Sequence, residues 1–229
     1  VKNVVPSQIE ALNYTNCVSK KIDGPFSIGG HSKGGNLAMF ASIQSRPEVQ
    51  DRINKAYVFD GPGFRDNKIF YTKGYERIKD KIIQFVPRDD IVGCIFYTPK
   101  NKLIVKARSV HFLQHNPYTW IINKNDNFKF LKKETRLVKI RRRTLILWVD
   151  QLSIEECEFM IETIISALGG INSNLSYRLR LLAIKFRTFI GNHFGYSKAT
   201  RKRLSKSVLL FIKIWNESHI HYIKHPNED

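Results

Sequence analysis

A serine in the first part of the sequence is flanked by four of the chain's 13 glycines, in the segment GGHSKGG (29–35). Glycines two residues before and after a serine form the pattern G-x-S-x-G, which displays a nucleophilic hydroxyl at a sharp strand-to-helix turn. Side chains in place of Gly30 and Gly34 are expected to collide with that strand and helix. The segment therefore predicts Ser32 as a nucleophile and the backbone amide of Lys33 as an oxyanion donor.

A glycine-rich turn can also be structural, or it can cradle a phosphate group. The phosphate-binding pattern ends in Gly-Lys-Ser or Gly-Lys-Thr, which this segment lacks. The flanking sequence favours the nucleophile, because the apolar run FSI (26–28) precedes it as a strand. The segment NLAMFASIQSR (36–46) follows with apolar residues at helical spacing. A purely structural turn is the open alternative.

A serine nucleophile needs a base, and the base needs an orienting acid. Chains with this pattern place the acid, and then a histidine, after later strands. The segment FVPRDDIVG offers Asp89 and Asp90 at the end of a strand, and Asp60 follows an earlier strand. We choose Asp90, because Ile-Val-Gly would carry the chain out of the strand. Asp89 is the close alternative and Asp60 the third, and each could simply cap a turn.

The candidate bases lie in SVHFLQHNPYTW, which contains His111 and His115. We choose His115, because Asn-Pro fixes the loop after it, whereas His111 could equally be a packed core residue. Their spacing would also suit a metal site on a helix. The nearby Pro117 and the lack of a third ligand argue against that site, so we expect no metal and no cofactor.

Strands that alternate with helices must position these residues. The expected strands are 26–28, 55–60, 81–87, 94–98 and 102–109, and the expected helices are 7–19, 36–46, 67–80, 152–170, 177–194 and 198–223. This alternation predicts βαβ units and a mainly parallel sheet. A boundary near residue 130 divides an α/β body (1–130) from a helical, basic C-terminal region (131–229).

The formal net charge is +18, and ten basic residues with no acidic ones lie between residues 176 and 216. Such a surface can bind anionic lipid or nucleic acid, although it can also be an ordinary solvated face. The region lacks the aromatic interleaving of a stacking platform, so we expect no specific nucleic acid. We expect an anionic membrane surface as the partner of residues 178–213.

Three well-separated cysteines without a CxxC spacing favour a reducing cytoplasm. No apolar run reaches the roughly 20 residues that span a bilayer, and no signal peptide is visible. The sequence therefore predicts a cytoplasmic protein, peripheral to the membrane at most.

Four segments, GGHSKGGNLA, FDGPGF, FVPRDDIVG and LQHNPYTW, are together similar to an uncharacterised bacterial α/β-hydrolase-like family related to class 3 lipases. The resemblance extends over about residues 5–170. It implies an α/β-hydrolase-like fold, a triad of Ser32, His115 and Asp90, and ester or lipid substrates. The sequence HNP departs from the family's usual His-Asp-Pro, at a position outside the triad.

Members of that family carry a much longer segment before the serine, which supplies the first strands and a second oxyanion amide. The resemblance thus implies that these N-terminal parts are missing. Two functions follow as expectations. The first is a serine esterase or lipase in which Ser32 attacks a carboxylic ester. The alternative is a truncated, catalytically impaired remnant that acts at most as a basic membrane- or anion-binding module.

Overall fold

A computed structural model describes residues 4–90, 92–99, 102–132, 134–153, 155–157, 159 and 197–226. The chain divides into two compact units, Val1–Ile146 with Tyr222–Asp229, and Leu147–His221. We call them the sheet unit and the helical unit. All the residues expected to do chemistry lie in the sheet unit.

A five-stranded sheet forms the centre of the sheet unit, with the strands in their sequence order. The strands are β1 (Phe26–His31), β2 (Ile53–Phe59), β3 (Ile82–Pro87), β4 (Lys102–Val105) and β5 (Phe130–Leu131). The first four are parallel, and β5 pairs with β4 in the antiparallel direction. His31 lies opposite Phe59, and Phe59 opposite Phe85, so β1, β2 and β3 end at the same edge. This confirms the predicted α/β class with a mainly parallel sheet.

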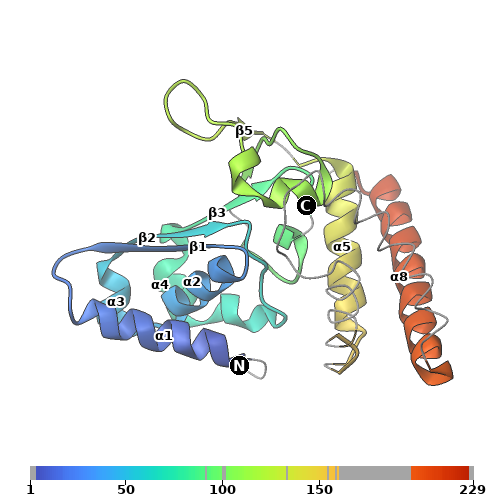
Figure 1. Cartoon of the computed structure of the whole chain (residues 1–229), viewed down its shortest axis with the longest axis horizontal. Helices are drawn as coiled ribbons and strands as arrows, with labels where there is room; N and C mark the ends of the chain where they lie inside the picture. The colour runs from blue at the N-terminus through green and yellow to red at the C-terminus, as the bar shows by residue number, and fades with distance from the viewer. Residues whose placement is uncertain are drawn as a thin grey trace. The chain divides into compact units, whose positions relative to one another are not determined.

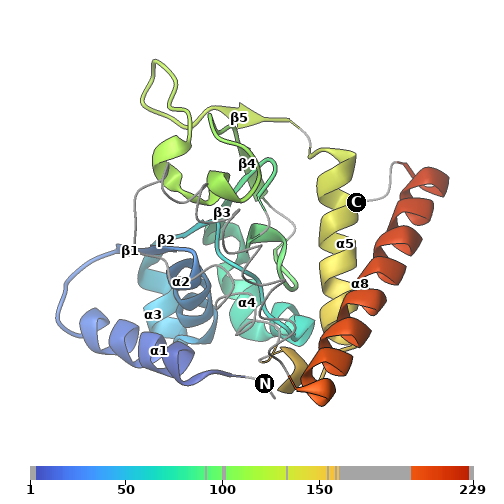
Figure 2. The ribbon, with the colours of Figure 1, turned by 45° about the vertical axis from the view of Figure 1, so that its right-hand side comes forward.

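Helices α1 (Pro6–Ser19), α2 (Lys33–Gln44), α3 (Pro47–Arg52) and α4 (Lys73–Ile78) cover one face of this sheet (Figure 1). The turned view keeps all four on that side (Figure 2). Ala56 and Val58 of β2 bury their side chains in one core with Met39 and Ile43 of α2. Helix α2, which follows Ser32, is therefore anchored directly on the strand that precedes Asp60.

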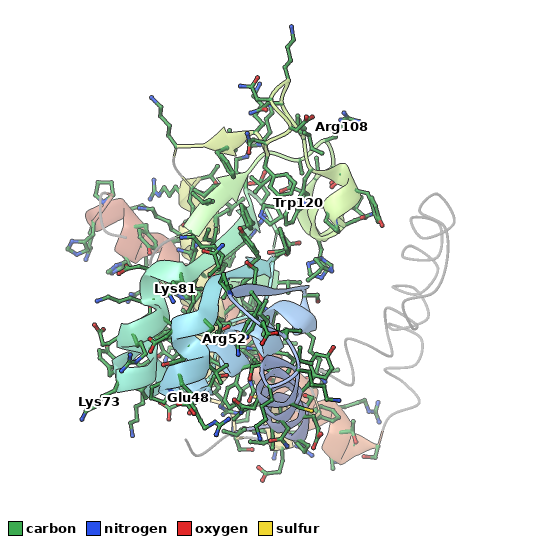
Figure 3. All side chains as sticks on the ribbon, turned by 90° about the vertical axis from the view of Figure 1, so that its left-hand side faces the viewer. Glu48, Arg52, Lys73, Lys81, Arg108 and Trp120 are labelled. Atoms are coloured by element: carbon green, nitrogen blue, oxygen red, sulfur yellow. The ribbon has the colours of Figure 1, made fainter. Side chains whose placement is uncertain are left out.

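The opposite face is filled by aromatic rings. Alternate residues of β2 and β3 point there, and the rings of Phe59 and Phe85 stack with centroids 5.1 Å apart. Trp120 and Phe128 cover them, 6.3 and 6.4 Å from Phe59. Figure 3 shows Trp120 on the side of the sheet away from Glu48 and Lys73. Both faces are thus covered, as parallel strands require.

Short 3₁₀ turns make up much of the rest of the sheet unit. They are η1 (Asn67–Tyr71), η2 (Lys79–Lys81), η3 (Val92–Cys94), η4 (His111–His115) and η5 (Pro117–Thr119). The expected strand at 94–98 is wrong, because Tyr97 forms only an isolated bridge with Phe64. The expected helix at 67–80 is broken into η1, α4 and the start of η2. Helices α3 and α5 (Arg136–Asp150) were not expected.

In the C-terminal region, α8 (Lys198–Lys224) confirms the predicted helix at 198–223. Within the helical unit, Trp148 Nε1 donates a 3.0 Å hydrogen bond to the Ser207 carbonyl, and its ring contacts Phe211. The expected helix at 177–194 and most of 152–170 lie outside the described residues. Among the helices that are described, none has the length and apolar character needed to cross a bilayer.

Candidate functional site

Ser32 connects β1 to α2 with a backbone that few residues adopt. Its φ and ψ are 57° and −128°, a left-handed conformation that costs a non-glycine residue on the order of 1–3 kcal/mol. The neighbouring structure holds it there. The Ser32 amide donates to the Phe59 carbonyl (2.9 Å), and the Gly35 amide donates to the Ser32 carbonyl (2.9 Å). The side chain of Ser32 is half-buried at the edge where the parallel strands end.

The glycines around Ser32 have unequal roles. A Cβ on Gly30 would lie 2.4 Å from the carbonyl group of Gly34, so a side chain there is excluded. This confirms the reason given for Gly30. The reason given for Gly34 is wrong, because a Cβ there meets nothing within 4 Å. The second close approach is at Gly35, where a Cβ would lie 2.9 Å from the Gly30 carbonyl oxygen.

Lys33 is the first residue of α2. Its amide therefore has no acceptor within the helix, and it lies at the positive end of the helix dipole. These are the properties expected of an oxyanion donor. The lysine side chain itself is exposed.

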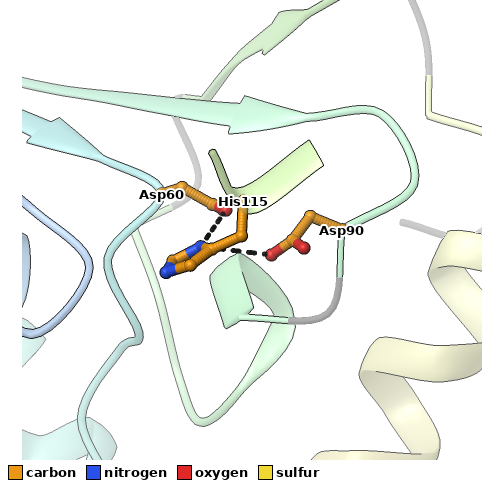
Figure 4. A group of neighbouring side chains, drawn as sticks. All are labelled: Asp60, Asp90 and His115. Carbon is orange, nitrogen blue, oxygen red and sulfur yellow. Dashed lines mark hydrogen bonds and ion pairs between the residues drawn. The ribbon is translucent and has the colours of Figure 1, made fainter. Parts of the chain in front are cut away.

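Two carboxylates approach the same nitrogen of His115 (Figure 4). His115 Nδ1 lies 2.8 Å from Asp60 Oδ2 and 3.7 Å from Asp90 Oδ2. Asp89, the close alternative to Asp90, is directed elsewhere and pairs with Arg88 at 3.1 Å. The structure thus brings His115 together with Asp90, our first choice, but the hydrogen bond is made by Asp60, which we placed third.

A backbone hydrogen bond holds each acid just after a parallel strand. Asp60 comes directly after β2, and its amide donates to the Phe85 carbonyl of β3 (2.8 Å). Its φ of 48° is left-handed, which aspartate tolerates better than most residues. Asp90 lies in the loop after β3, where its Oδ2 accepts a 2.7 Å hydrogen bond from the Val92 amide. Both carboxylates have no exposed surface.

Burial dominates the electrostatics of this group. It raises the pKa of Asp60 to about 7, opposed by hydrogen bonds from Asp90 and the Gly93 backbone. Burial, together with the charge and hydrogen bond of Asp60, raises the pKa of Asp90 to about 8. Burial also lowers the pKa of His115, an effect that the Asp90 charge opposes. The pair of acids therefore retains a proton near neutral pH, while His115 is a neutral base.

His31, the residue before Ser32, covers the His115 ring. The ring centroids lie 4.6 Å apart, and His31 Nε2 donates a 2.8 Å hydrogen bond to the His115 carbonyl. Burial lowers the pKa of His31, opposed by its hydrogen bond to the His115 backbone. Sequence reasoning missed this contact, because the residue between glycine and serine is unspecified in the pattern.

Two amides fix the loops that carry His115 and Asp60. Gln114 accepts a hydrogen bond from the Asp89 amide (3.0 Å), and its own carbonyl accepts one from Trp120 Nε1 (2.8 Å). It thereby joins the turn of His115 to the loop of Asp90.

The second amide is Asn36 of α2. Its Nδ2 donates to the carbonyls of Pro62 and Gly63, just after Asp60, at 3.1 and 2.8 Å. Its Oδ1 accepts from Gln8 of α1 at 2.8 Å. Both Gln114 and Asn36 were missed, and a buried amide within an apolar pattern is the signal that could have indicated them.

The chemistry available here is proton transfer. In the described part of the chain, no hydrogen bond joins the Ser32 hydroxyl to the His115 ring. The ring that contacts His115 is that of His31, the residue before Ser32. Nucleophile–base hydrogen bonds are often long before substrate binds. Asp60, Asp90 and His115 also offer ligand atoms within 4.8 Å of one another, a spacing that could hold a divalent cation. A cation would have to displace the proton between Nδ1 and Asp60.

Comparison with known proteins places the chain in a family. The Mbeg1-like family model matches residues 1–166, which include every residue of this site. No curated protein and no solved structure matches the chain. Because the match extends over well more than half of its length, the chain belongs to the Mbeg1-like family.

Proposed function

We propose that the chain is a serine hydrolase of the esterase or lipase type that acts on carboxylic esters. Ser32 Oγ attacks the ester carbonyl carbon while His115 Nε2 takes the hydroxyl proton. The Lys33 amide donates to the oxyanion that forms. His115 then passes the proton to the leaving alkoxide, and a water activated by the same nitrogen releases the acid and restores Ser32.

The observation that carries this proposal is the fixed His115 ring. Its Nδ1 is held at 2.8 Å by Asp60, with Asp90 beside it, so the other nitrogen is the one left for proton exchange. An ionised carboxylate at Nδ1 stabilises the imidazolium that forms during attack. We assign Asp60 as the orienting acid and Asp90 as the carboxyl that holds the shared proton.

We also infer that the sheet unit is an α/β-hydrolase-like fold. The support is the strand β1, the left-handed Ser32 and the helix α2 in succession, at the edge where parallel strands end. The order of serine, acid and histidine along the chain is the order of that fold. An acid after β2 and a second after β3 are both compatible with it.

A fluorophosphonate probe tests the proposal, because it phosphonylates only an activated serine. We expect labelling of the full chain, loss of labelling in Ser32→Ala, and unchanged labelling in Ser27→Ala, which removes an exposed hydroxyl from β1, the strand before Ser32. Hydrolysis of a p-nitrophenyl ester should follow the same pattern. A chelator should change neither readout, since the group between Asp60 and His115 is assigned as a proton.

Other results would count against it. Labelling that persists in Ser32→Ala would remove Ser32 as the nucleophile. A chain that melts cooperatively but is never labelled would contradict the hydrolase and favour the non-catalytic, basic binding module. Loss of esterase activity on chelation would favour a cation bound by Asp60, Asp90 and His115.

A further inference from the structure

One face of α8 exposes large aliphatic side chains. We call them the α8 stripe: Leu209, Ile212, Ile220 and Ile223, with 66, 48, 53 and 64% of their surface exposed. At 3.6 residues per turn these four positions lie within about 80° of one another around the helix. The opposite side of the helix is buried at Leu204, Ile214 and Tyr222. The α8 stripe thus consists of two pairs of exposed aliphatic side chains, with exposed Asn216 between them on the same line of the helix. Such a line is a candidate interaction surface.

Lysines follow one border of the α8 stripe. Lys206, Lys213 and Lys224 project from positions adjacent to it on the helix, and all three residues are exposed. Across residues 198–224 the helix carries seven Lys or Arg residues and one acid, a net charge of +6 (7 minus 1). That acid, Glu217, lies 3.9 Å from Lys213 Nζ, with both side chains more than half exposed.

We propose that the α8 stripe binds the surface of an anionic lipid bilayer. Aliphatic side chains of an amphipathic helix enter the boundary between head groups and acyl chains, and neighbouring lysines neutralise the head groups. The sequence indicated a basic membrane-binding region at 178–213, of which residues 178–196 lie outside the described residues. The structure adds the apolar half of the surface and assigns it to α8. The inference does not depend on the proposed hydrolase.

The chemistry of this surface favours an anionic bilayer over a second copy of the chain and over nucleic acid. A second copy of a chain with net charge +18 would bring lysine borders against each other, which opposes self-association through this face. Nucleic acid would meet the lysines, but a stripe of leucine and isoleucine offers bases no aromatic ring on which to stack. An anionic bilayer complements both the lysines and the aliphatic side chains.

Sedimentation of the full chain with lipid vesicles tests the proposal. We expect about tenfold or stronger partitioning onto phosphatidylcholine–phosphatidylserine vesicles than onto phosphatidylcholine alone at low salt. Lys206→Gln with Lys213→Gln should weaken anionic partitioning about 30-fold. Leu209→Ser with Ile220→Ser should weaken it about tenfold or more, since the aliphatic contacts are lost.

The matched control is Lys68→Gln with Lys73→Gln, which removes the same charge from exposed positions of the sheet unit. It should bind as the parent does. Equal binding to both vesicle types, or equal loss in the control pair, would overturn the assignment to α8. Light scattering that shows a dimer in the parent and a monomer in Leu209→Ser with Ile220→Ser would overturn it in favour of a second copy. Thermal melts confirm that each variant is folded.

Discussion

At the scale of single residues, burial decides which members of the site carry charge. Asp60 and Asp90 have no exposed surface and face the same imidazole nitrogen, so ionising both would place two like charges together without water. The pair therefore keeps one proton, and the ionised member is stabilised by the Nδ1–H of His115. The shorter distance, 2.8 Å, makes Asp60 the acceptor and leaves Asp90 as the protonated partner.

This arrangement predicts how stability depends on pH. The pKa of Asp90 is raised to about 8 in the folded chain, whereas an unfolded aspartate titrates near 3.9. The folded state then binds more protons than the unfolded state, so the free energy of unfolding falls as pH rises toward the folded pKa. Below about pH 7 the histidines of the unfolded chain bind protons, which opposes this fall in unfolding free energy. Above about pH 7 they are neutral, so the opposition ends.

We therefore expect urea denaturation to give an unfolding free energy about 1 kcal/mol lower at pH 8 than at pH 7. In Asp90→Asn the proton is replaced by a permanently neutral amide, so this loss should largely disappear. Asp89→Asn serves as the control, because it changes the adjacent carboxylate, which pairs with Arg88. This variant should still lose stability between pH 7 and pH 8. A parent whose stability rises over this interval would contradict the shared proton.

At the scale of elements, the parallel strands bring distant residues together. Ser32 and Asp60 each directly follow one of two paired strands, whose last residues, His31 and Phe59, lie opposite each other. Short apolar runs and glycine turns were sufficient to predict these strands and to place Ser32 and Asp60 at their ends. The choice among Asp60, Asp89 and Asp90 could not be predicted, because it depends on how each loop leaves the sheet.

Other elements were missed for physical reasons that can be named. The run CIFYT has high β propensity, but the chain leaves the sheet at the end of β3, and Tyr97 only bridges Phe64. Tertiary packing here outweighs propensity. Helix α5 carries basic residues among its apolar ones, which obscured its apolar face. Its start signal, Thr135, whose hydroxyl accepts a hydrogen bond from the Val138 amide, was not used. The His31–His115 contact depends on the packing of two segments 84 residues apart.

Helix α2 carries a further prediction, because Asn36 joins it to the loop that follows Asp60. Asn36→Ala removes three hydrogen bonds and leaves the Pro62 and Gly63 carbonyls without that donor. We expect a loss of about 2–3 kcal/mol in unfolding free energy, measured by urea denaturation. Gln44→Ala on the same helix is the control and should cost less than about 0.5 kcal/mol. Equal effects of the two changes would contradict the role assigned to Asn36.

At the scale of the whole molecule, net charge connects the proposed hydrolase site with the proposed membrane binding by α8. This connection requires no contact between the site and α8. A chain with net charge +18 concentrates at any anionic surface, and it does so less as salt screens the attraction. If the substrate is an ester within such a surface, binding through α8 raises the local concentration of Ser32 around it. The lysines beside the α8 stripe would then affect the rate only where a bilayer is present.

An ester embedded in anionic vesicles should therefore be hydrolysed about tenfold faster than the same ester in neutral vesicles at low salt. Lys206→Gln with Lys213→Gln should abolish this difference, whereas Lys68→Gln with Lys73→Gln should preserve it. All of these proteins should hydrolyse a water-soluble ester at one rate, because none of the four lysines belongs to the site. Release of fatty acid is measured, and Ser32→Ala supplies the background. Equal rates on both vesicle types, in a protein active on the soluble ester, would show that membrane binding and catalysis are unrelated.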